Sequence, residues 1–188
     1  GGTLKQSSNL LHMNVKQALA VDRTMQVAIS DREYFVGEKR FGAAPGFLGG
    51  RGSERWAPGN PNAQLVPSFV PTLGREDTRR PRMDIGLGVW TGSTRRYYPM
   101  ALLRERGAAF IDRIDGRSVL IYVEPETSTP VANFFRAKDA RMEGRDVRLD
   151  DGSLVRMGVL LNRDGKRQSV ERPQQIFTGW YGFSLTFP

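Results

Sequence analysis

Three acidic residues lie close together in the stretch "FIDRIDGRSVLIYVEPET": Asp112, Glu124 and Glu126. A hairpin that turns at Asp115-Gly116 would pair the strands that carry the first two and could bring the carboxylates together. Paired carboxylates can act as general acid and base, or bind a hard cation such as Ca²⁺. The competing interpretation is that the Asp112 side chain caps a nearby backbone group or forms an ion pair with a neighbouring arginine on the sheet surface.

Two arginines and two tyrosines follow one another in "STRRYYPM": Arg95, Arg96, Tyr97 and Tyr98. Aromatic rings beside guanidinium groups can form a platform for a sugar, a nucleic-acid base or an acidic peptide. Because successive side chains of a strand point to opposite faces, the alternative places one tyrosine in the core and the other on the surface. Pro99 then begins a short helix. We interpret this stretch mainly as a corner in the fold and secondarily as a ligand site.

Other reactive groups are few. The sequence contains no cysteine, which excludes disulfides, thiol catalysis and Cys-ligated zinc. His12 is the single histidine, so any Ser-His-Asp triad would have to include it. Ser128 and Thr127 lie in a polar loop, but a hydroxyl nucleophile needs a base, and apart from His12 only carboxylates and lysines are available. We expect no metal site and no cofactor.

The stretch "FTGWYGF" near the end of the sequence is dense in aromatic residues. An exposed aromatic cluster would mark a surface for a partner or a carbohydrate, whereas a buried one closes the core and needs no partner. We favour burial for this stretch, and we interpret Trp56 and Trp90 as core anchors as well.

The chain is strongly basic, with a formal net charge of +8 and an isoelectric point near 10.3. Of its 28 basic residues, 23 are arginines and five are lysines. Such a balance is compatible with polyanion or nucleic-acid binding. Outside "GREDTRRPRMD", however, the arginines are scattered among acidic residues, as in "RMEGRDVRLDDGSLVR", which is more typical of solvated strand faces.

The elements that must position these residues are mostly short strands. Apolar runs such as "SVLIYV" are strand-sized, and none reaches the roughly 18 residues of a membrane helix. Turn signals recur closely, at Asp115-Gly116, Glu143-Gly144, Asp151-Gly152 and Asp164-Gly165, which favours antiparallel hairpins over βαβ units. We predict a mainly β fold (β-rich α+β) of antiparallel meander and hairpin sheets, with a barrel-like closure as an option and a few short helices.

A chain of 188 residues fits one domain. We predict a flexible arm at residues 1–13, followed by a single β-rich domain at residues 14–188. Residues 14–41 would form a helix and a hairpin. Residues 42–81 read as a long Gly/Pro-rich loop that docks its embedded aromatic residues on the domain, and residues 82–188 as its core.

The predicted N-terminal helix begins after Asn14, a favourable N-cap residue. Its apolar residues Val15, Ala18 and Leu19 share one face, which is typical of a short helix of about two turns. Two short strands around Ser30-Asp31 would follow as a hairpin.

The order of elements from "DIGLGVW" through "RRYYPMALL" and "FIDRIDGRSVLIYVEPETSTPVANFF" to "QQIFTGWYGFSLTFP" resembles the bacterial family known as domain of unknown function 3179. The resemblance covers about residues 83–188, a little over half of the chain. The positions that match the family pattern are Tyr98, Pro99, Asp112, Gly116, Pro125 and Trp180.

The chain also departs from this family pattern. Glu124 and Thr127 stand where the family has cysteines, and the family histidine falls near Gly107. If relatives use those groups for redox or metal chemistry, this chain does not do so in the same way. The resemblance therefore implies a fold and a habit of export, but no activity.

We interpret the chain as an uncharacterised, non-catalytic binding or scaffold module of bacterial type. A protein or a polyanion is the expected partner. Three observations favour a periplasmic or secreted location over the cytoplasm: a start without Met, the absence of cysteine, and the export habit of the resembled family. The first alternative is a carboxylate-based or cation-assisted, hydrolase-like enzyme. The second is a polyanion or nucleic-acid binder that uses its arginines.

Overall fold

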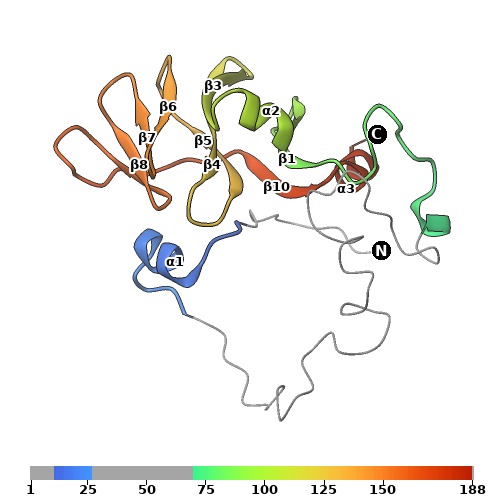
Figure 1. Ribbon diagram of the computed structural model, residues 1–188, viewed down its shortest axis with the longest axis horizontal. Helices are drawn as coiled ribbons and strands as arrows, with labels where there is room; N and C mark the ends of the chain where they lie inside the picture. The colour runs from blue at the N-terminus through green and yellow to red at the C-terminus, as the bar shows by residue number, and fades with distance from the viewer. Residues whose placement is uncertain (1–10, 27–69, 188) are drawn as a thin grey trace, which may run out of the picture.

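The computed structural model describes residues 11–26 and 70–187, and the chain there folds into three antiparallel sheets with short helices (Figure 1). The elements, in chain order, are α1 (Val15–Val21), a 3₁₀ turn (Val70–Leu73), β1 (Ile85–Trp90), β2 (Arg95–Pro99), α2 (Met100–Glu105), β3 (Ala109–Ile114), β4 (Arg117–Glu124), β5 (Thr129–Phe134), β6 (Ala140–Glu143), β7 (Asp146–Leu149), β8 (Leu154–Arg156), β9 (Val159–Leu161), β10 (Gln174–Gly179) and α3 (Trp180–Thr186).

The strand order is β10-β1-β2 in the first sheet, β3-β4-β5 in the second and β6-β7-β8-β9 in the third. Every pairing is antiparallel, which confirms the predicted mainly β class. The barrel-like option is not found among the described residues, because the three sheets are separate and open. Within the same residues, no helix is long and apolar enough to cross a bilayer.

The turn signals explain much of this hairpin order. Asp115 and Gly116 join β3 to β4 with φ angles of 49° and 76°, the left-handed pair that a type I′ turn requires. A second such turn joins β8 to β9 at Met157 (φ 51°) and Gly158 (φ 76°). The sequence pattern did not predict this turn, because a methionine rarely occupies the left-handed region.

The second sheet lies between the other two, so its central strand β4 is buried on both faces (Figure 1). Val119 and Ile121 point to one side, into a core shared with the first sheet and α2. Leu120 and Tyr122 point to the other side, into a core shared with the third sheet. Because side chains alternate along a strand, the parity of a β4 residue decides which of the two cores it enters.

The C-terminal aromatic residues pack against the first sheet. Trp180 and Phe183 of α3 are buried, and the Phe183 ring lies over the backbone of Gly88 on β1. A Cβ atom at position 88 would lie 2.3 Å from this ring, so the approach requires glycine. The aromatic stretch is therefore part of the core at these two positions.

Helix α1 forms as predicted but buries a polar side chain instead of its apolar face. Asn14 caps it as expected, within a capping box completed by Gln17. The apolar face does not point to the core, however: Val15 is 59% exposed and Leu19 is 41% exposed, whereas Gln17 is 2% exposed. A polar contact, rather than burial of the apolar face, sets the orientation of the helix, because the buried Gln17 contacts Glu124 of β4. The predicted hairpin at Ser30-Asp31 and most of the Gly/Pro-rich loop lie outside the described residues.

Candidate functional site

Asp112 forms a closed network with two residues of the "RRYY" stretch. Its Oδ2 atom accepts hydrogen bonds from Arg96 Nη1 at 2.6 Å and from Tyr98 Oη at 2.8 Å, while Oδ1 accepts from the Arg113 amide at 2.7 Å. Burial acts to raise the pKa of Asp112, but these hydrogen bonds outweigh it and hold the pKa below its ordinary value. Both carboxylate oxygens of Asp112 therefore already have partners within the protein. This agrees with the second interpretation of the sequence, in which Asp112 forms an ion pair with a neighbouring arginine.

The other two residues of the stretch also have architectural contacts. Tyr97 donates a hydrogen bond from its hydroxyl to the carbonyls of Asp84 (2.6 Å) and Thr178 (2.8 Å). The Arg95 guanidinium lies 5.4 Å from the centre of the Phe187 ring. Tyr97 and Tyr98 occupy successive positions of β2 and point to opposite faces, so they do not form one platform. Burial raises the pKa of both phenols.

The three carboxylates, whose convergence was one of two interpretations, do not come together. Asp112 pairs with Val119 across the β3–β4 hairpin and shares its face, whereas Glu124 lies five positions further along β4 and points to the opposite face. Glu126 lies in the turn after β4, where Arg145 Nη1 donates to its Oε1 atom at 2.9 Å. Among the described residues, no group of three or more acidic or histidine side chains is placed to hold a metal ion.

A different site forms around Glu124 alone, beneath α1. Glu124 is 4% exposed and lines a cavity of about 20 Å³, which we call the Glu124 cavity. Its lining residues are Leu11, His12, Met13, Gln17, Tyr122, Glu124, Val131, Met157, Gly158 and Arg172. Such a volume is enough for about one water molecule or one small polar group.

Two buried polar atoms at this cavity lack a hydrogen-bonding partner among the described residues. They are Glu124 Oε1 and Arg172 Nε. Tyr122 Oη and Asn133 Oδ1 also lack a hydrogen bond of good geometry, but the Asn133 side chain acts on the pKa of the Tyr122 phenol as a hydrogen-bonding neighbour. Nearly all buried polar atoms of native proteins are hydrogen-bonded, so a group of exceptions around one cavity needs an explanation. The unpaired acceptor and donor atoms at this cavity are together suited to bind a polar group of a ligand.

The electrostatics of the cavity follow from burial. Loss of water raises the pKa of the Glu124 carboxyl, and the nearby Glu126 charge adds to this, while hydrogen bonds from Gln17 and backbone amides act in the opposite direction. Burial also lowers the pKa of Arg172. Both pKa shifts are expected when a charged group is buried and its lost hydration is not fully replaced by hydrogen bonds or opposite charges.

No protein-family model, curated protein or solved structure matches this chain. The resemblance to the domain of unknown function 3179 family therefore stays a prediction.

The Glu124 cavity adjoins a larger groove at the start of α1. This outer groove, of about 500 Å³, is lined by Leu11, His12, Met13, Asn14 and Thr127, and the first three residues also line the cavity. Residues 11–21 are held beside the sheets at both ends. Thr129 Oγ1 donates to the His12 carbonyl at 3.1 Å, and Arg167 donates to the Ala20 and Val21 carbonyls at the end of α1. Cavity and groove thus share one wall, which α1 and the residues before it form.

Sequence reasoning found Glu124 but missed its surroundings. Tyr122 carried a signal, because it precedes Glu124 by two positions and so must share its face of β4. Gln17 carried a weaker one as the third helical residue of a capping box. Asn133 carried one only through the register of the β4–β5 hairpin, which places it opposite Leu120 and so on the Glu124 face. Arg172 carried none, since only the packing of a distant segment brings it to this side of β4.

Proposed function

We infer that the chain is a non-catalytic binding module that recognises a small hydroxyl-bearing ligand at the Glu124 cavity. The observation that carries this proposal is the buried Glu124 Oε1 atom, which accepts no hydrogen bond from the described residues although Glu124 lines a cavity. A buried acceptor that stays unpaired costs about 1–3 kcal/mol, and a ligand that supplies the donor recovers this energy on binding.

The mixture of unpaired atoms favours a hydroxyl group. Glu124 Oε1 needs a donor, Arg172 Nε needs an acceptor, and the Tyr122 hydroxyl can serve as either. A hydroxyl both donates and accepts, and it fits a cavity of about 20 Å³. The rest of such a ligand would occupy the outer groove, where Leu11 and Met13 provide apolar contacts. A monosaccharide or another polyol has this chemistry.

The carboxylate-based enzyme has less support from the same geometry. Glu124 has the raised pKa of a general acid. A hydrolase of this type also needs a second carboxylate across the substrate. Asp112 lies on the opposite face of the sheet, and Glu126 is engaged by Arg145.

A thermal-shift titration with monosaccharides and polyols tests the proposal. A ligand at one hundred times its dissociation constant should stabilise the chain by about 2.7 kcal/mol, which appears as a clear rise in melting temperature. Glu124→Leu removes the acceptor and should abolish the rise, whereas Glu126→Gln, a change in the turn after β4 at a residue that does not line the cavity, should preserve it. A ligand panel that leaves the wild-type melting temperature unchanged, or a Glu124→Leu variant that still responds, would refute this function.

A further inference from the structure

A second groove lies at the other end of β4, where this strand leaves the Asp115-Gly116 turn. It has a volume of about 620 Å³ and is lined by Gly116, Arg117, Ser118, Phe134, Phe135, Arg136 and Glu171. None of these residues lines the Glu124 cavity. We call it the Arg117 groove. We propose that the Arg117 groove binds single-stranded nucleic acid, with a base stacked on Arg117 and a phosphate held by Arg136.

Arg117 is held as a flat platform. Its guanidinium carbon lies 3.5 Å from the centre of the Phe134 ring, so one face of the group is stacked on the aromatic ring. Glu171 fixes its edge through two hydrogen bonds, from Nη1 to Oε1 at 2.8 Å and from Nη2 to Oε2 at 2.6 Å. The side chain is nevertheless 49% exposed, and a rigid guanidinium plane is a surface on which an unpaired base can stack.

Glu171 is itself tied to the groove wall. The Phe134 amide donates to the Glu171 carbonyl at 2.8 Å, so the backbone of residue 171 extends the edge of β5. The platform is therefore built from three residues whose positions are set by β4, β5 and this bridge. Binding on such a platform needs no reordering of the arginine side chain, which lowers its entropic cost.

Arg136 lies beside the platform without a partner among the described residues. It lines the groove, its side chain is exposed, and its guanidinium group forms no hydrogen bond or ion pair within the described part of the chain. Arg113 does not contribute, because it lies opposite Ser118 in the β3–β4 register and therefore points to the other face of the sheet from Arg117.

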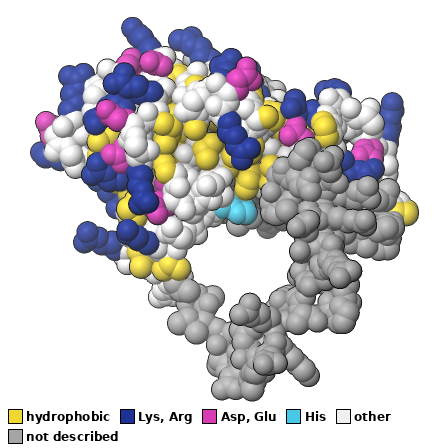
Figure 2. Space-filling model, in the orientation of Figure 1, with side chains coloured by type: hydrophobic (Ala, Val, Ile, Leu, Met, Phe, Trp, Pro, Cys, Tyr) yellow, Lys and Arg dark blue, Asp and Glu magenta, His cyan; other side chains and the backbone are white. Residues whose placement is uncertain are grey.

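The groove suits a base with a neighbouring phosphate better than a free phosphate ion. A site for one phosphate brings several cations to a point, whereas here Arg117 is paired with Glu171 and Arg136 is left to contact a phosphate. Basic side chains cover much of the face seen in Figure 2, but most are scattered or paired with acids, as at Arg145, Arg148 and Arg156. A base can stack on Arg117 only if it is free of a complementary strand, so the ligand is single-stranded.

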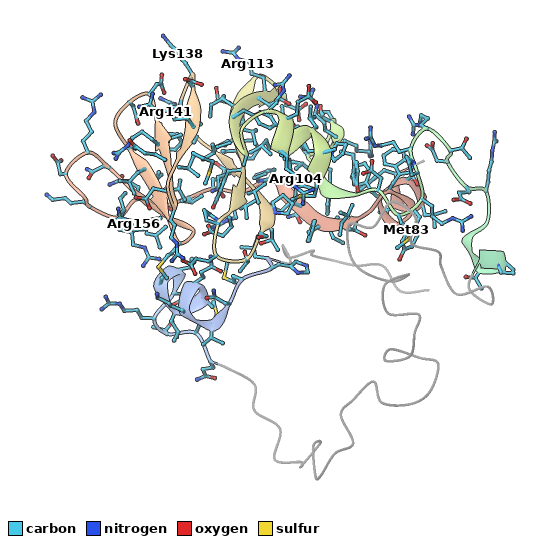
Figure 3. All side chains as sticks on the ribbon, viewed as in Figure 1. Met83, Arg104, Arg113, Lys138, Arg141 and Arg156 are labelled. Atoms are coloured by element: carbon cyan, nitrogen blue, oxygen red, sulfur yellow. The ribbon has the colours of Figure 1, made fainter. Side chains whose placement is uncertain are left out.

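Fluorescence anisotropy of the full chain with a labelled oligothymidylate tests this inference. Arg117→Ala should weaken binding about tenfold through loss of base stacking. Arg136→Ala should reduce the slope of log affinity against log salt by about 0.7, the change expected for one lost phosphate contact on a single strand. The matched control is Arg156→Ala, which removes the same charge from β8; in Figure 3 this residue lies nearer α1, away from Arg113.

Two further binding measurements separate the contribution of base stacking from that of charge. Arg117→Lys keeps the charge but loses the plane, so it should weaken oligothymidylate binding nearly as much as Arg117→Ala does. An abasic strand of equal length carries the same phosphates, and its affinity should be lower and insensitive to Arg117→Lys. The proposal is overturned if the wild-type chain binds the abasic strand or heparin as tightly as oligothymidylate, or if Arg156→Ala weakens binding as much as Arg117→Ala.

Discussion

The side chains of Gln17 and Glu124 meet in the interior, where α1 packs against the end of β4. Both are nearly fully buried, and a hydrogen bond from Gln17 acts to lower the pKa of the glutamate that burial raises. This contact explains why α1 turns a polar face inward and leaves Val15 and Leu19 exposed. It also links the position of the N-terminal helix to the protonation of one carboxyl group.

Glu124 should make the free energy of unfolding depend on pH in a defined direction. Because its folded pKa lies above the ordinary value of 4.5, the folded state binds this proton more tightly than the unfolded state. The contribution is full below pH 4.5 and is lost as pH rises through the folded pKa. Urea unfolding of wild type and Glu124→Gln between pH 4 and pH 8 should therefore show wild type losing stability relative to the variant as pH rises.

Asp112 should show the opposite dependence and serves as the comparison. Its folded pKa lies below the ordinary value of 3.8, so its contribution is present above pH 3.8 and is lost as pH falls through the folded pKa. Asp112→Asn should remove this acid-dependent part of the unfolding free energy, measured by the same urea titrations between pH 2 and pH 5. Parallel pH profiles for wild type and Asp112→Asn would contradict the network with Arg96 and Tyr98.

Removal of the Tyr98 hydroxyl should destabilise the fold. Tyr98 is 3% exposed and donates to the Asp112 carboxylate, and a hydrogen bond to a charged group contributes about 1.5–3 kcal/mol. Tyr98→Phe should lower the unfolding free energy by about that amount in chemical denaturation at pH 7. In a variant that already carries Asp112→Asn, the further loss should be smaller, because the charged acceptor is gone; equal losses in both backgrounds would show that the two residues act independently.

Gly88 should tolerate no side chain. An added Cβ atom would lie 2.3 Å from the Phe183 ring, so Gly88→Ala must displace α3 or the ring, at a cost of about 1–3 kcal/mol. Gly92→Ala is the matched control, since no atom lies within 4 Å of its added Cβ. Thermal unfolding should separate the two variants, and combining Gly88→Ala with Phe183→Leu should recover part of the loss.

Arg167 should determine how firmly α1 is attached. Its guanidinium donates to the carbonyls of Ala20 and Val21 at the C-terminal end of the helix, where a cation is also favourable for the helix dipole. In Arg167→Ala, we expect hydrogen exchange to accelerate by about tenfold at the Ala18 amide, in line with about 1.4 kcal/mol for such contacts. The amides of β4 should keep their protection, and faster exchange there would indicate that the whole fold, and not the helix alone, had been weakened.

Local sequence determined the antiparallel character of this protein. Pairs such as Asp115-Gly116 encode a tight turn through their own backbone preferences, so the strands on either side must pair with each other. Alternation along a strand also determined that Tyr97 and Tyr98 separate. The same rule would have separated Asp112 from Glu124 had the register of the β3–β4 hairpin been counted through to position 124.

Only the tertiary structure determined which residues come together at the Glu124 cavity and at the Arg117 groove. The face that α1 buries depends on the buried carboxyl of Glu124, because local periodicity records which residues share a face but not which face meets a partner. Arg172 reaches the Glu124 cavity, and Glu171 reaches Arg117, only because the segment before β10 runs beside β5. Contacts between segments so distant in the chain arise from packing, which no local pattern of residues encodes.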